Sequence, residues 1–117
     1  MKDFNRDTGR LGESLADEHL RKKGYEILER NFSNKFGEID IIARDKNVLV
    51  FVEVKAKKGI DFGMPEEMVG RGKLHKIRNM ATIYIKGQEL LCRIDVVAVV
   101  LGPNNEVTRL THYENVY

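Results

Sequence analysis

Apolar residues recur along this chain with two different periods, and the first stretch has the period of a helix. In residues 8–23 the apolar and small side chains fall on one half of a helical wheel. Thr8 is suited to the N-cap and Gly24 to the C-terminal stop, so the pattern predicts a helix over 8–23. Glu13 lies at the border of the apolar half, and we expect its carboxylate at the rim of whatever this helix packs on.

The pattern then changes to the alternation that is typical of β-strands. It predicts three strands, at 25–32, 38–43 and 48–55. A turn at Ser33–Lys35 and Gly37 separates the first two, and residues 44–47 connect the second to the third. Further along, Ile77, Met80, Ala81 and Tyr84 have helical spacing within a predicted helix from Lys73 to Lys86.

Two more strands complete the predicted fold. Residues 90–101 are almost continuously apolar, as expected for a strand covered on both faces, and 106–113 follow a turn as an edge strand. The order is therefore α-β-β-β-α-β-β, in which the strand–helix–strand crossover joins parallel strands. We expect an α/β fold with a mixed five-stranded sheet and helices packed against it, in a single domain over residues 1–117.

Charged side chains interrupt the apolar hairpin GEIDIIARDKNVLVFVEVK, residues 37–55. Burying a charge without a partner is costly, so these acids need an explanation. Alternation puts Glu53 and Lys55 on one face of their strand. A four-residue loop would pair Asp40 with Phe51, and a two-residue turn would pair Asp40 with Glu53. Either even-length connection brings Asp40 to the face of Glu53 and Lys55, whereas an odd-length one would not.

Two adjacent carboxylates repel each other, and a divalent cation with oxygen ligands resolves that conflict. Lys55 would then hold a water molecule or stabilise developing charge, and Glu13 could supply another oxygen if its helix packs over this face. Glu38 has the simpler interpretation of a solvated residue at the strand entry. The competing interpretation is a plain Glu53–Lys55 salt bridge at a strand end, and the residues alone leave both open.

The net charge of +2 is unevenly distributed. Residues 55–78 hold seven basic and three acidic side chains, a balance of +4, so the rest of the chain carries −2. This segment favours a polyanionic partner, although a solvated lysine face explains it equally well. The candidate phosphate contacts are Lys57, Lys58, Lys73, Lys76 and Arg78.

Other chemistry is sparse in the sequence. Cys92 is the only cysteine and no apolar run reaches the roughly 18 residues of a membrane span, so with no export signal we expect a cytoplasmic protein. The three histidines lack metal-ligand spacing with Cys92. We expect a structural role for Asp95, in a pair with Arg93 or a helix, and Phe62 either stacks on a base or anchors its loop.

Several segments in order resemble the YraN-type family of predicted endonucleases. They are GRLGESLADEHLRKKGYEILERNF, FGEIDIIARD, LVFVEVKAKK, FGMPEE and RIDVVAVV. The arrangement of Asp40 and Glu53-Val54-Lys55 is also similar to the Asp…(Asp/Glu)-X-Lys motif of restriction-endonuclease-like nucleases, including Holliday-junction resolvases. Two positions depart from the family pattern: Lys57 stands where Arg is usual, which loses bidentate phosphate recognition, and Ile94 stands where an aromatic is usual.

The resemblance implies a three-layer α/β/α core with strand order 1-2-3-4-5, in which strands 2 and 5 run opposite to the others. It implies that Glu13 is the acid of the first helix, Asp40 and Glu53 the metal ligands and Lys55 the catalytic lysine. The function expected is a Mg²⁺- or Mn²⁺-dependent endonuclease that hydrolyses phosphodiester bonds, in DNA rather than RNA, with the Val54 carbonyl as a further ligand. Branched repair or recombination intermediates are one substrate option, and they would call for a homodimer. The alternative is a non-catalytic module that binds nucleic acid or a partner protein and retains the nuclease fold.

Overall fold

The computed structural model describes residues 6–59, 69–88 and 90–117, with the side chain of Arg6 left aside. The predicted loop after the third strand, including Phe62, Gly63 and Pro65, lies outside these residues. The described elements are, in order, α1 (Arg6–Lys22), β1 (Glu26–Asn34), β2 (Gly37–Asp45), β3 (Val48–Lys58), α2 (Arg71–Ile85), β4 (Leu91–Leu101) and β5 (Val107–Tyr113). The predicted element order is confirmed.

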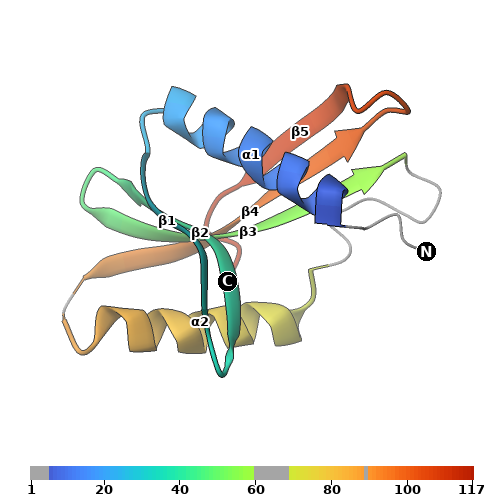
Figure 1. Cartoon of the computed structure of the whole chain (residues 1–117). Helices are drawn as coiled ribbons and strands as arrows, with labels where there is room; N and C mark the ends of the chain where they lie inside the picture. Colours follow the sequence, from blue (N-terminus) through green and yellow to red (C-terminus); the bar gives the residue numbers. More distant parts are fainter. Residues whose placement is uncertain (1–5, 60–68, 89) are drawn as a thin grey trace.

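The strands form one mixed sheet in the order β1-β2-β3-β4-β5. The pairing of β3 with β4 is parallel and the other three pairings are antiparallel, so β2 and β5 run opposite to the rest. Figure 1 shows α1 on one side of the sheet and α2 on the other, which confirms the three-layer arrangement. In the described part of the chain, neither helix has the length and apolar character needed to span a membrane.

The face of the sheet under α1 is packed through small and aliphatic side chains. Ala16 and Leu20 of α1 are fully buried against a cluster that includes Val50 and Val52 of β3. Gly12 lets α1 approach β3 closely, because a Cβ there would lie 2.4 Å from the Cβ of Ala56. The predicted apolar half of this helix is therefore the half that is buried.

Both ends of α1 can be compared with the prediction. The N-terminal prediction was wrong: the helix already includes Arg6, the first described residue, so Thr8 lies inside it, buried, rather than at its N-cap. The C-terminal stop is confirmed, because Gly24 takes a left-handed conformation with φ +95°. The Tyr25 N–H then donates to the Leu20 carbonyl at 3.0 Å, which closes the last turn.

The opposite face packs against α2. Ile77 and Met80 of α2 are 1% exposed and belong to one cluster with Phe51 and Ile42. The helix starts two residues before the predicted Lys73 and ends one residue before the predicted Lys86, which adopts a left-handed conformation with φ 56°. The predicted buried stripe of this helix is confirmed.

The connection between β2 and β3 resolves the two alternatives left open by the sequence. Asp45 pairs with Val48, so the turn has two residues, Lys46 and Asn47. Lys46 has φ 58°, as tight hairpin turns require. The paired register ends at Ile41–Val52, one residue short of Asp40 and Glu53.

Asp95 has the structural role that was predicted. It is fully buried and accepts hydrogen bonds from Arg93 Nε at 3.0 Å, His112 Nε2 at 2.7 Å and the Asn115 N–H at 2.9 Å. Burial alone would raise the pKa of Asp95, but these hydrogen bonds outweigh it and lower the pKa below the ordinary value. The carboxylate thereby ties β5 and the last residues of the chain to β4.

We expect Asp95→Asn to lower the free energy of unfolding by about 3 kcal/mol, because it removes one partner from a buried charged network. The pKa of Asp95 is lower in the folded protein than in the unfolded chain. Its contribution is therefore present above 3.8, the ordinary aspartate value, and is lost as the pH falls through the lower folded pKa. Urea unfolding at pH 7 and pH 3 measures both effects.

The matched control is Glu114→Gln, which alters an exposed member of the same network, 3.8 Å from Arg93. It should change stability by less than about 1 kcal/mol. An equal loss in both variants would contradict the role given to Asp95.

Candidate active site

Asp40 lies where β2 separates from β3. The pairing of the two strands runs from Asp45–Val48 to Ile41–Val52. Ile39 and Ile42, three residues apart, both pack on the α2 side, so the alternation of β2 breaks around Asp40. On the neighbouring strand β1, Asn31 has a left-handed φ of 56° at the same level. The hairpin of β1 and β2 thus bends away from β3 at this point.

The Asp40 carboxylate takes over a hydrogen bond that β2 no longer supplies. Its Oδ2 accepts the Val54 N–H at 2.8 Å. In a strand, the N–H and carbonyl of one residue point to the same edge, so the Val54 carbonyl also faces the gap beside Asp40. The backbone of β3 therefore fixes the position of this carboxylate.

Glu53 is the buried acid of the pair, with 3% of its surface exposed. Its Oε1 is buried and has no hydrogen-bond partner within the part of the chain that the structure describes. Burial, followed by the negative charge of Asp40, raises the pKa of Glu53 to about 8, against the opposing charges of Lys73 and Lys55. A hydrogen bond with the Asp40 side chain, which requires a proton on one of the two acids, acts in the same direction.

Two lysines reach this pair of acids from different elements. Lys73, in the first turns of α2, places its Nζ 3.7 Å from Glu53 Oε2. Lys55 is half-buried two residues after Glu53 on the same face of β3, and its charge lowers the pKa of Glu53. The ion-pair partner of Glu53 in the described residues is thus Lys73 and not Lys55, so the simple Glu53–Lys55 salt bridge does not account for the site.

Glu13 lies on the α1 side of the site, at the rim that was predicted. Burial and then the charge of Asp40 raise its pKa, and Arg30, 3.9 Å away, opposes this. With its side-chain amide turned so that the nitrogen faces the two carboxylates, Asn31 donates to Glu13 at 3.1 Å and to Glu38 at 3.3 Å. Glu38 is exposed, as expected of a strand-entry residue.

The described residues do not gather three or more His, Cys, Asp or Glu side chains into a ready cation cage. Asp40 and Glu53 form a pair, and Glu13 does not join them as a third direct ligand. The donor set still suits a hard divalent cation, because the buried Glu53 Oε1 lacks a partner and the neighbouring acids repel each other. A cation bound by both carboxylates and the Val54 carbonyl would relieve both unfavourable features.

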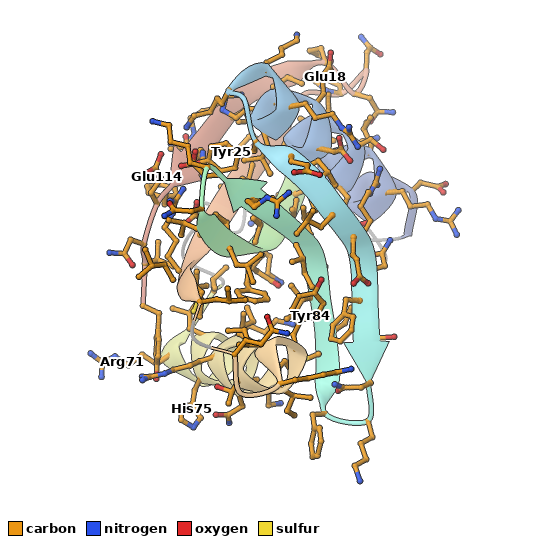
Figure 2. The ribbon with its side chains drawn as sticks, turned by 90° about the vertical axis from the view of Figure 1, so that its left-hand side faces the viewer. Glu18, Tyr25, Arg71, His75, Tyr84 and Glu114 are labelled. Atoms are coloured by element: carbon orange, nitrogen blue, oxygen red, sulfur yellow. The ribbon has the colours of Figure 1, made fainter. Side chains whose placement is uncertain are left out.

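The predicted phosphate contacts divide into two groups. Lys58, Lys73, Lys76 and Arg78 are exposed, whereas Lys57 is 2% exposed and therefore not on the surface. Figure 2 shows that Arg71 and His75 project outward from the same helix α2. Lys57 aside, these exposed basic residues belong to the end of β3 and to α2.

Four contacts of the site were missed in the sequence. The Asp40 bond to a backbone N–H depends on where the strands separate, which side-chain patterns do not encode. Asn31 and Arg30 gave no signal because both read as ordinary polar positions of an alternating strand. Lys73 was singled out as a phosphate contact, yet its ion pair with Glu53 joins elements 20 residues apart in the chain.

In metal-free protein, Glu53→Gln should raise the free energy of unfolding at pH 9 and have little effect at pH 4.5. Native Glu53 keeps its proton up to about pH 8, while the unfolded carboxyl loses it near 4.5, so the wild type loses stability between these values. The gain has an upper limit of about 5 kcal/mol. Urea unfolding in EDTA measures it, with Glu18→Gln on the surface of α1 as the control. A constant difference across this pH range would refute the assignment.

Comparison with known proteins places the chain in a family. The family described as "Uncharacterised protein family UPF0102" matches residues 12–99. The UPF0102 protein of Dictyoglomus turgidum is 41% identical over 116 residues, which cover 97% of this chain and 98% of the relative. That of Caldanaerobacter subterraneus is 42% identical over 122 residues and the full length of both chains. That of Syntrophus aciditrophicus is 45% identical over 102 residues, or 85% of this chain and 80% of the relative. The chain therefore belongs to the UPF0102 family, in agreement with its YraN-type resemblance.

Proposed function

We propose that this protein is a Mg²⁺- or Mn²⁺-dependent endonuclease that hydrolyses phosphodiester bonds in DNA, in the cytoplasm. The observation that carries the proposal is the buried Glu53 carboxyl beside Asp40, with one oxygen unpartnered in the described residues. A pair of acids held together in this way lowers stability, so a fold would gain by replacing one of them with an apolar residue. Cation binding would explain why both acids are present.

Each residue of the site then has a separate task. Asp40, held by the Val54 N–H, and Glu53 would bind the cation together with the Val54 carbonyl. When bound, a divalent cation polarises the phosphate and lowers the pKa of a coordinated water. Lys55 would orient the attacking water or stabilise negative charge on the phosphate. Glu13 would add negative charge from α1 on the other side of Asp40.

The exposed basic side chains support a polyanionic substrate. Lys58 follows the site at the end of β3, and Lys76 and Arg78 lie on α2 beyond Lys73. Cations on two neighbouring elements would contact successive phosphates of one strand. For branched DNA the same surface would be used twice, once from each protomer of a homodimer.

The second candidate is a non-catalytic module that binds nucleic acid or a partner protein. The basic residues of α2 favour it, because they need no metal to bind phosphate. The buried acids count against it, since carboxylates next to a phosphate-binding surface weaken the binding of a polyanion.

Wild-type protein should cleave linear, single-stranded or four-way-junction DNA when Mn²⁺ or Mg²⁺ is supplied. Glu53→Gln and Lys55→Ala should reduce cleavage about 100-fold or more, because each removes a charge that acts on the reacting phosphate. Gel analysis of labelled DNA measures this, with Lys22→Ala on α1 as a charge-matched control. Wild-type protein that binds DNA without cleaving it would instead support the non-catalytic module. Wild-type protein that binds neither metal nor DNA would reject both candidates.

Lys76→Ala should weaken DNA binding and reduce the slope of log affinity against log salt concentration by about one unit. Each neutralised phosphate contributes 0.7–0.9 to that slope. Fluorescence anisotropy from 50 to 200 mM salt in EDTA measures it without any cleavage. Lys22→Ala, which removes an equal charge from α1, should leave the slope unchanged; equal effects of the two variants would contradict a phosphate contact at α2.

A further inference from the structure

A row of three side chains runs from the acidic site to the edge of the sheet. Glu53 of β3 is in register with Val96 of β4, and Val96 is in register with Tyr113 of β5. Residues in register on adjacent strands point to the same face, which here is the face covered by α2. Along this row the side chains are a carboxylate, an aliphatic group and an aromatic ring, and neighbouring strands are separated by roughly 4.8 Å.

A cavity of about 300 Å³ opens over the apolar end of this row. It is lined by Val69, Leu74, Val96, Tyr113 and Val116. Leu74 directly follows Lys73 in α2, and Lys73 contacts Glu53, so the cavity adjoins the candidate active site. Aliphatic walls and one aromatic ring suit a flat, weakly polar group rather than a charged one.

We propose that this cavity receives one unpaired base of the DNA strand that lies on the active site, and that the substrate class is accordingly single-stranded DNA or the single-stranded portion of a branched molecule. The inference rests on the proposed function for the identity of the polyanion. The strand backbone follows the exposed basic residues Lys73, Lys76 and Arg78, and the base beside the bound phosphate turns inward to contact Tyr113.

Pairing in a duplex disfavours this mode of binding. A base held in a duplex stack reaches a protein cavity only after it is unpaired and unstacked, at a cost in free energy, whereas a base in a single strand is already available. Contact with an aromatic side chain strengthens binding by about tenfold or more per base and depends little on sequence. The cavity therefore distinguishes the pairing state of DNA and not its sequence.

The test compares a twelve-residue oligothymidylate with a twelve-unit abasic strand that carries the same phosphates. Affinities are measured by fluorescence anisotropy in EDTA, so that no cleavage or metal is involved. Wild-type protein should bind the oligothymidylate about tenfold more tightly. Val69→Trp, which fills the cavity, and Tyr113→Leu, which removes the ring, should bring the ratio close to one and leave the affinity for the abasic strand unchanged.

Val69→Ala and Tyr113→Phe are the matched controls and should keep the preference, with circular dichroism to check the fold of every variant. A 2-aminopurine in a single-stranded oligothymidylate should also change its fluorescence on binding to the wild type, which needs no variant. Equal wild-type affinities for the two strands, no binding of either, or a preference that survives Val69→Trp would overturn the inference. If metal-dependent cleavage is still observed in that case, the proposed nuclease function is kept and only the base-binding cavity is rejected. If the protein prefers the strand with bases but does not cleave DNA, the cavity is kept and the nuclease function is rejected.

Discussion

The candidate site depends on a gap between two strands. β2 separates from β3 after the Ile41–Val52 pair, so the Val54 N–H of β3 has no backbone partner on β2. The Asp40 carboxylate accepts this N–H instead. That single hydrogen bond holds an acid beside Glu53, which lies buried on the α2 face. A strand pair that continued in register would give the Val54 N–H a backbone partner on β2, and the Asp40 side chain would not be needed for that hydrogen bond. The gap in the sheet thus creates the site.

Two buried acids of this protein show what such a site demands. Asp95 is surrounded by donors from Arg93, His112 and the Asn115 backbone, and its pKa is lowered despite burial. Glu53 is buried beside another acid, with one lysine at 3.7 Å, and its pKa is raised to about 8. Similar burial produces opposite shifts because the neighbours differ in charge and in hydrogen-bonding ability. The first arrangement is that of a structural residue, and the second is typical of a residue retained for its chemistry.

The sequence predicted the layers of the fold because apolar period and turn residues are local properties. Alternation predicted the strands, and the two-residue turn at Lys46 and Asn47 is one of the even-length connections that the sequence favoured. Local signals failed where a distant element decides the outcome. Thr8 resembled an N-cap, but α1 extends to Arg6. Lys57 continued a basic run, but in the folded protein it is buried, with 2% of its surface exposed. The break of β2 around Asp40 has no sequence signal, because it follows from how the two strands diverge.

The non-catalytic alternative must account for the same two acids. A domain that only binds nucleic acid gains affinity from each basic side chain and loses it from each neighbouring carboxylate. Above pH 8, where Glu53 is ionised in the metal-free protein, its replacement by glutamine would remove both the repulsion from Asp40 and the negative charge next to Lys73, at almost no change in volume. At such a pH a pure binding module would therefore improve in stability and in affinity through this single substitution. A cation-binding nuclease would lose its chemistry by it, and this difference makes Glu53 the residue on which the two functions separate.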